Sequence, residues 1–157
     1  MKQRLGLMLA ALWWGSLTGL GFVVVPQLFV HLSGPSAAGA MAARLFTAQT
    51  WLGAACAMLL LLIGMSDRKR GGAPNAAVQA AIKFVVAGFL LLLLVEFGAA
   101  PRIVDARAAG GNLRLWHTLA SAMLLAQWLC VGLALWRLGR GGDAPRRSTD
   151  APPPQAY

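Results

Sequence analysis

The chain has 157 residues, of which 58% are hydrophobic and only 12% are charged. A soluble domain usually carries about 25% charged residues, so this composition excludes an ordinary soluble protein and favours an integral membrane protein of one domain. The net charge of +9 lies in short segments between long apolar runs, where Lys and Arg set the orientation of a membrane protein. We therefore expect no nucleic-acid partner.

The first apolar run extends from Leu5 to Val25 and follows a short basic start. At 1.5 Å per residue it is about 31 Å long, which is enough to cross the hydrocarbon core. The apolar part of a signal peptide is shorter, about 7–15 residues, so we expect a retained helix over about 5–30. Pro26, near its end, can kink the last turn because proline lacks an N–H donor.

Three further apolar runs predict helices over about 37–65, 76–100 and 113–138. Pro101 is expected to end the third helix, and Gly110-Gly111 marks a turn before the fourth. The tail, 139–157, is rich in Gly, Pro and Arg and is expected to be disordered. The fold class predicted for residues 1–138 is therefore an all-α, up-down bundle of four transmembrane helices.

The basic residues are distributed unevenly between the two predicted sides of the membrane. Ten of the fourteen Lys and Arg residues fall at the two termini or in and beside the 66–75 segment, and four fall on the opposite side. Because Lys and Arg accumulate in cytoplasmic segments, this asymmetry predicts that both termini are cytoplasmic. We expect a multi-pass protein of a bacterial-type inner (plasma) membrane.

Small residues predict where the helices pack. Gly15 and Gly19 form a GxxxG motif on the first helix, and Gly53 and Gly88 lie on the second and third. Lipid is as apolar as leucine, so close backbone approach at such residues drives helix association. We expect them to pack the bundle internally, with formation of a homo-oligomer as the alternative.

Tryptophans and cysteines fit the same bundle. Trp116 and Trp136 lie at the two ends of the fourth helix, as expected for residues at membrane interfaces. Four deeper tryptophans are expected to fill the bundle, namely Trp13, Trp14, Trp51 and Trp128. Cys56 and Cys130 lie in apolar runs without CxxC spacing and are expected to be small packing residues.

Polar residues gather in the half of the bundle that is predicted to face outward. The set consists of Gln27, His31, Arg44, Gln49, Glu96, Arg102, His117 and Ser121. A carboxylate inside a span usually faces the bundle and has a partner, so Glu96 is expected to pair with Arg44, Arg102 or His117. Three interpretations remain open. The cluster is a structural hydrogen-bonded network, a binding or transport site in a cavity, or a metal or haem site that uses His31 and His117.

No sequence motif points to catalysis. The chain has no HExxH, no paired carboxylates, no Ser–His–Asp set and no phosphate-binding loop,. Two histidines and scattered methionines are too few for a convincing metal site. We therefore expect no cofactor, no bound metal and no enzymatic activity.

Several short motifs follow one another along the chain: Trp13-Trp14-Gly15, Gly19, Phe22, Pro26, Arg44-Leu45-Phe46, Trp51, Pro101-Arg102-Ile103, Leu115-Trp116-His117 and Ser121. In this order and spacing they resemble the domain-of-unknown-function 4149 family, which is also called the transmembrane-protein-205-like family. The resemblance covers roughly Leu5 to Arg137. It implies a small four-helix membrane protein without an assigned activity, and it singles out Pro26, Arg44, Pro101, Arg102 and His117.

The leading functional expectation is a structural, accessory or interaction role in the inner membrane. The alternative is a small transporter, or a ligand- or metal-binding protein, that uses the polar cluster. The lipid bilayer is the expected environment, and a protein partner or a second copy of the chain is a possible partner.

Overall fold

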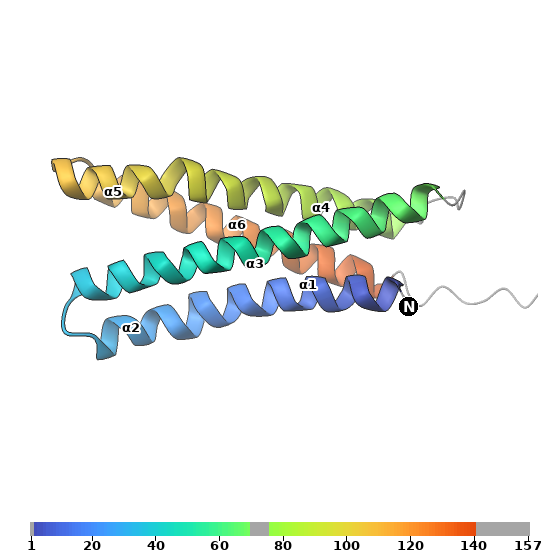
Figure 1. The fold of residues 1–157 in the computed structure, drawn as a ribbon, viewed down its shortest axis with the longest axis horizontal. Helices are drawn as coiled ribbons and strands as arrows, with labels where there is room; N and C mark the ends of the chain where they lie inside the picture. The colour runs from blue at the N-terminus through green and yellow to red at the C-terminus, as the bar shows by residue number, and fades with distance from the viewer. Residues whose placement is uncertain (1, 70–75, 141–157) are drawn as a thin grey trace, which may run out of the picture.

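The computed structural model describes residues 2–69 and 76–140, which form four long helices and contain no strand (Figure 1). Each long helix is long and apolar enough to cross a membrane. The all-α bundle of four spanning helices is therefore confirmed. The tail that was predicted to be disordered lies, from residue 141 onward, outside the described residues, as do residues 70–75 of the charged turn.

The first and third long helices each consist of an α-helix, a π-helical segment and a second α-helix. The first is α1 (Lys2–Thr18), η1 (Gly19–Val24) and α2 (Val25–His31). The third is α4 (Ala76–Leu93), η2 (Leu94–Ala99) and α5 (Ala100–Ala109). The second and fourth long helices are uninterrupted and are α3 (Pro35–Lys69) and α6 (Leu113–Arg140).

Two tight connections, 32–34 and 110–112, lie together at one end of the bundle, which we call the short-loop end (Figure 1). Gly110 has φ 74°, a left-handed conformation that L side chains rarely adopt, and it ends α5,. Asn112 then caps α6, because its Oδ1 accepts a hydrogen bond of 3.0 Å from the Leu115 N–H,. The two connections give two hairpins, α1-η1-α2 with α3 and α4-η2-α5 with α6.

Pro101 does not end the third helix, contrary to the sequence prediction. The helix continues through it to Ala109. Just before the proline, the Ala100 N–H binds the Val95 carbonyl, five residues back. This wider π turn relieves the clash that a proline ring makes with the preceding turn of a regular α-helix. The first helix uses the same arrangement, because η1 ends two residues before Pro26.

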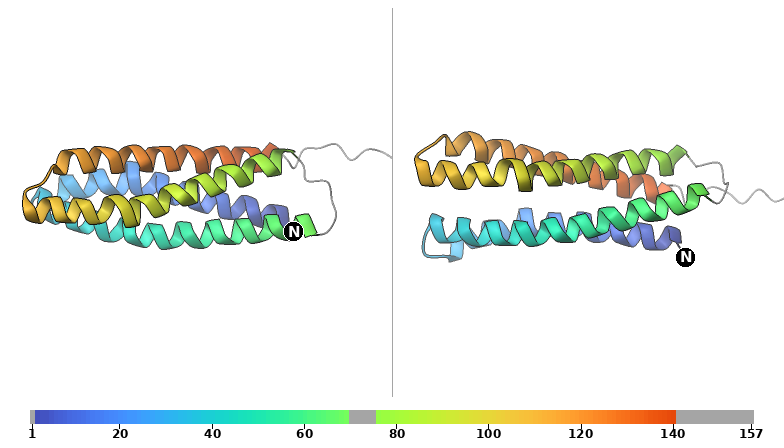
Figure 2. Two further views of the ribbon diagram at one scale, coloured as in Figure 1. Left: turned by 90° about the horizontal axis from the view of Figure 1, so that it is seen from above. Right: turned by 45° about the horizontal axis from the view of Figure 1, so that its top comes forward.

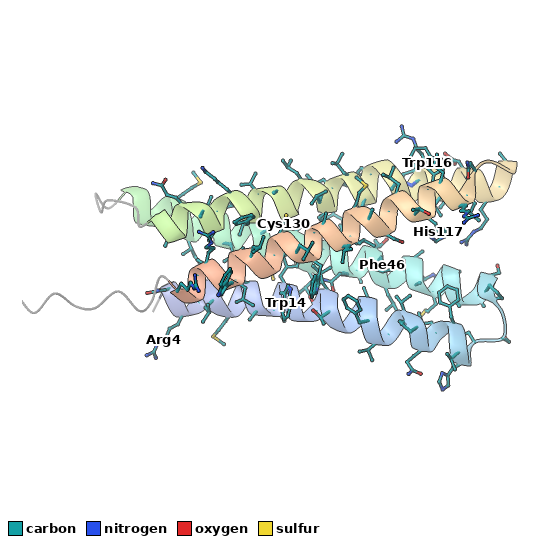
Figure 3. All side chains as sticks on the ribbon, turned by 180° about the vertical axis from the view of Figure 1, so that it is seen from behind. Arg4, Trp14, Phe46, Trp116, His117 and Cys130 are labelled. Atoms are coloured by element: carbon teal, nitrogen blue, oxygen red, sulfur yellow. The ribbon has the colours of Figure 1, made fainter. Side chains whose placement is uncertain are left out.

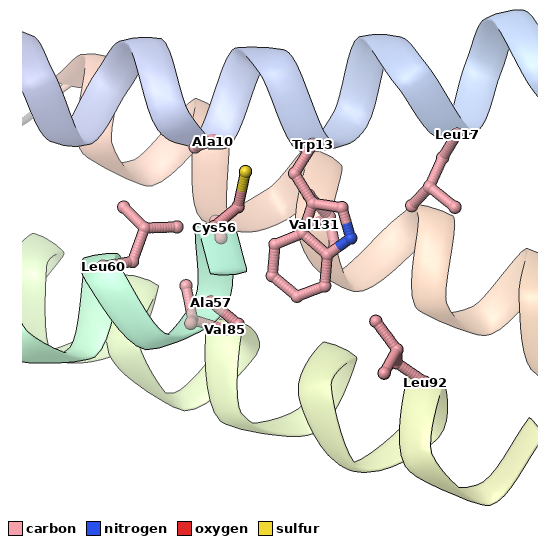
Figure 4. Close-up of a cluster of buried hydrophobic side chains, with 10 residues drawn as sticks. Ala10, Trp13, Leu17, Cys56, Ala57, Leu60, Val85, Leu92 and Val131 are labelled. Atoms are coloured by element: carbon pink, nitrogen blue, oxygen red, sulfur yellow. The ribbon is translucent and has the colours of Figure 1, made fainter. Parts of the chain in front are cut away.

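The core is centred on Trp13, which is fully buried among residues from all four long helices (Figure 4). The indole fits because two glycines face it. A Cβ on Gly53 would lie 2.6 Å from Trp13 Nε1, and a Cβ on Gly88 would lie 3.5 Å from the far edge of the ring. Gly15 and Gly19 do not pack in this way, because an added Cβ would meet nothing within 4 Å. The GxxxG motif therefore makes no close helix contact within the described chain.

The other tryptophans divide between the core and the surface. Trp14 and Trp128 stack with their ring centroids 5.4 Å apart, and Gly132 leaves the space that Trp14 Nε1 occupies. Trp51 was predicted to fill the bundle, but it does not, because 70% of its surface is exposed on α3. That side of α3 faces outward, where an aromatic ring contacts lipid.

The bundle is closed toward the termini and open at the short-loop end. In the closed half, α1 packs on both α3 and α6, and α4 packs on both α3 and α6. Toward the short-loop end, close packing runs mainly within each hairpin, with α2 on α3 and with α5 and η2 on α6. The two pairs of helices diverge there (Figures 1 and 2).

Candidate functional site

An open cavity of about 1320 Å³ lies between the two hairpins in the short-loop half. All four long helices contribute to its wall, which is mainly apolar. Six residues add polar groups to the lining: Arg44, Thr47, Glu96, Arg107, His117 and Ser121. Figure 3 labels Phe46 of α3 and His117 of α6, two lining residues that come from opposite hairpins.

Glu96 lies in the π-helical segment η2, and two threonines of α3 hold its carboxylate. Thr47 Oγ1 donates to Oε1 at 3.2 Å, and Thr50 Oγ1 donates to Oε2 at 3.1 Å. Each carboxylate oxygen thus receives one hydrogen bond from the opposite hairpin. The structure records no ion pair between Glu96 and the described residues, so the predicted pairing with Arg44, Arg102 or His117 is not seen.

The backbone after Glu96 has fewer donors than a regular helix. The Ala100 N–H donates to the Val95 carbonyl, and the next residue, Pro101, has no N–H to donate,. The Arg102 guanidinium supplies one more donor, to the Gly98 oxygen at 3.3 Å. Such backbone is tolerated at membrane depth where it lines a polar or water-filled space.

Arg107 lies at the end of the cavity nearest the short-loop end, which we call the mouth. It belongs to α5, but its Nη2 atom lies 3.2 Å from the position that a Cβ on Gly39 of α3 would occupy. The missing side chain of Gly39 therefore makes room for the guanidinium. Arg44, five residues farther along α3, is about 8 Å deeper by helix rise. Both arginines line the cavity.

The deep end of the cavity is aromatic. Trp128 lines it and donates from Nε1 to Thr18 Oγ1 at 2.8 Å. Phe22 packs edge-on against the same indole, with ring centroids 5.7 Å apart. The hydrogen bond and the two aromatic contacts fix the orientation of Trp128 and give the cavity a firm apolar floor.

The structure separates the predicted polar cluster into parts. Arg44, Glu96, His117 and Ser121 line the cavity. Gln49 does not, because it is buried lower in the bundle, where its Nε2 donates to Ser16 Oγ at 2.9 Å.

The remaining three members of the predicted cluster lie away from the cavity. Gln27 and His31 are exposed on α2, where His31 Nδ1 lies 3.1 Å from the Gln27 carbonyl oxygen. Arg102 lies with its guanidinium carbon 4.9 Å from the centre of the Trp116 ring. Within the described residues, no group of three or more His, Cys, Asp or Glu side chains converges as a metal site would require.

Sequence reasoning missed Thr47, Thr50, Arg107 and the role of Trp128. A signal for the threonines was present, because Arg44, Thr47 and Thr50 follow each other at intervals of three and so lie along one side of a helix. Arg107 gave no such signal, since it was expected in a loop after Pro101. Its position on a helix depends on the π segment, which sequence patterns do not reveal.

The comparison with protein families agrees with the resemblance carried by the sequence motifs. Residues 8–112 match a domain of unknown function, DUF4149. The chain belongs to this family. The match runs from α1 through α5 and so includes Glu96, both threonines and Arg107, whereas α6, with His117 and Trp128, lies beyond it. No curated protein and no solved structure matches the chain.

Proposed function

We propose that this membrane protein binds an amphipathic molecule in the cavity between its two helix hairpins. The observation that carries the proposal is the cavity itself, about 1320 Å³ in volume with a mainly apolar wall and a few polar groups. Sites for drug-sized ligands usually measure about 300–1,000 Å³ and have the same kind of lining. A lipid-sized occupant therefore suits this volume.

The order of groups along the cavity fits an elongated amphiphile. His117 and Trp128 both line the cavity from α6, and their separation in sequence corresponds to about 16 Å of helix rise. Arg107 and His117 are nearest the short-loop end and Arg44 is deeper, whereas Trp128 lies at the deep end. Glu96 also lies deep, but two threonines already satisfy its carboxylate. A polar head near the mouth and an apolar tail directed inward would match this gradient.

A purely structural role would account less well for these residues. Gln49 donates to Ser16 across two helices, and it is buried and does not line the cavity. Glu96, His117 and Ser121 instead line open volume. An ionisable group inside a membrane span is a functional-site candidate by default. We propose binding without catalysis.

The distribution of Lys and Arg supports placing the short-loop end on the outer side of a bacterial-type inner membrane, with both termini in the cytoplasm. The cavity would then be supplied from the outer leaflet or from the adjoining aqueous space. The bilayer is the nearest source of amphiphiles for a site inside a span.

The test introduces a phenylalanine at a position that lines the cavity and, as a control, at a neighbouring position that does not. Ser121→Phe places a ring in the cavity, whereas Ala122→Phe adds the same ring to an exposed residue on another face of α6. We expect wild type and Ala122→Phe, purified in a mild detergent, to retain bound amphiphile in native mass spectrometry. We expect Ser121→Phe to lose it while keeping its helical circular dichroism.

Two results would refute the proposed function. One is a wild-type protein, purified and then supplied with lipid, that carries no bound amphiphile. The other is a Ser121→Phe variant that retains as much as Ala122→Phe.

A further inference from the structure

Resting on the proposed function, we infer that the occupant of the cavity is a lipid-like amphiphile with an anionic head group, which Arg44 and Arg107 bind at the mouth. The charged and titratable side chains that line the cavity are Arg44, Arg107, His117 and Glu96. Two permanent positive charges thus face one carboxylate. Each charged side chain can bind a ligand only with donors or acceptors that no other group of the protein already uses.

Glu96 has donors of its own. Thr47 and Thr50 each give a hydrogen bond to one carboxylate oxygen, at 3.2 and 3.1 Å. No ion pair with an arginine is recorded among the described residues, so the carboxylate does not occupy the guanidinium donors. The two arginines are therefore available to a second anion.

Arg102, at the same end of the bundle, is an arginine whose guanidinium already has partners within the protein. It donates to the Gly98 carbonyl at 3.3 Å and lies against the Trp116 ring. Arg44 and Arg107 have no comparable hydrogen bond with the described residues, although each guanidinium carries five N–H donors. Both side chains are exposed, and the planar donor fork of a guanidinium suits phosphate or carboxylate.

Arg107 reaches across the mouth from one hairpin to the other. Its guanidinium reaches from α5 to the backbone of α3 beside Gly39, with Nη2 and Nη1 3.2 and 3.7 Å from the position of an added Cβ. It therefore joins the two hairpins across the opening. An anionic head between Arg107 and Arg44 would be contacted from both hairpins, with its tail in the apolar space below.

The apolar wall of the cavity decides between a lipid and a free anion. Phe29, Phe46, Ile103 and Leu124 line the cavity beside the charged groups. Inorganic phosphate would satisfy the guanidinium donors but would leave this surface unfilled. Burial of apolar surface contributes to binding in proportion to area, so the tail is needed for affinity and the charge for selection.

The experiment titrates delipidated protein in a nonionic detergent with dioleoylphosphatidylglycerol or dioleoylphosphatidylcholine, which share their acyl chains. Retained lipid is measured by native mass spectrometry. We expect wild type to prefer the anionic lipid by about tenfold, which corresponds to ~1.4 kcal/mol. Arg44→Gln and Arg107→Gln should each reduce the preference to about threefold or less, and Arg44→Lys should retain part of it.

Arg114→Gln is the matched control. It removes the same charge from an exposed residue at the same end of the bundle that does not line the cavity. We expect its lipid preference to equal that of wild type. Inorganic phosphate at the same concentration should displace little bound lipid. Helical circular dichroism and a single size-exclusion peak would show that each variant is folded.

The outcomes separate the two proposals. Equal binding of both lipids by wild type would overturn the anionic head group while leaving the proposed function intact. A preference for phosphatidylcholine that Glu96→Gln abolishes would also overturn it, in favour of recognition of the cationic group. Unchanged preference in both arginine variants would contradict the assigned site. Binding of neither lipid would contradict the proposed function as well.

Discussion

Gly53→Ala should destabilise the bundle, because the position has no room for a side chain. A Cβ there would lie 2.6 Å from Trp13 Nε1 and 2.7 Å from Leu92 Cδ1, whereas ordinary carbon contacts are about 3.5–4.0 Å. The Leu92 methyl can rotate away, but Trp13 is fully buried and Leu92 almost so. Overpacking of this kind typically costs about 1–3 kcal/mol.

Alanine also favours a helix over glycine by roughly 0.5–1 kcal/mol, which offsets part of the loss. We therefore expect a net decrease of about 1–2 kcal/mol in the free energy of unfolding. For a chain of this size, each kcal/mol shifts Tm by roughly 2–4 °C, so the expected decrease in Tm is ~2–8 °C. Thermal and SDS unfolding followed by circular dichroism in a nonionic detergent would measure both quantities.

Gly15→Ala is the matched control, because it belongs to the GxxxG motif but meets nothing within 4 Å. Its free energy of unfolding should be unchanged or slightly higher. A Gly53→Ala variant as stable as wild type would refute the close packing of Trp13 on Gly53. An equal loss of stability in Gly15→Ala would also refute it, since the motif would then make a contact that this structure lacks.

Three further predictions concern hydrogen bonds and orientation. Thr50→Val removes a donor to the Glu96 carboxylate and should lower the free energy of unfolding by about 1.5–3 kcal/mol. The loss should be smaller in a protein that also carries Glu96→Leu. Equal losses with and without Glu96→Leu would contradict the contact. Trp128→Phe and Thr18→Val remove the two partners of one hydrogen bond, so a double-mutant cycle should show coupling of about 0.5–1.5 kcal/mol, and strict additivity would argue against the bond. Cysteine introduced at Ala109, exposed at the end of α5, should react with a membrane-impermeant maleimide in intact cells; labelling only after permeabilisation would reverse the predicted orientation.

The spanning helices could be predicted because four apolar runs of this length, in a chain with 12% charged residues, are longer than a soluble core helix needs,. Helix ends were harder where backbone geometry overrode residue type. Pro101 predicts a helix end in a regular α-helix, but the preceding π turn of η2 lets the helix continue to Ala109. No pattern in the amino-acid sequence predicts that π turn.

The packing glycines show the same limit. Gly15 and Gly19 form the motif that a sequence search favours, yet nothing lies against them. Gly53, which with Ala57 has the same spacing and was also predicted to pack, is the one whose open space a tryptophan of another helix fills. Which glycine matters depends on which large residue lies opposite, and that is decided by long-range packing.

The candidate site was predicted in part. The concentration of polar residues toward one end singled out Glu96, Arg44 and His117, and all three line the cavity. The i, i+4 spacing of Gln27 and His31 placed them on one face of a helix, but that face is exposed. Periodicity shows which residues share a face and not which face turns inward.

A structure determined in lipid nanodiscs would decide whether an amphiphile occupies the cavity, because it would show what lies between the hairpins in a bilayer. We predict that the hairpins stay apart at the short-loop end. We also predict an elongated density that runs from Arg44 and Arg107 toward Trp128. Contact between Phe46 and Leu124 that closes the space, with no density between the hairpins, would contradict the proposed binding site.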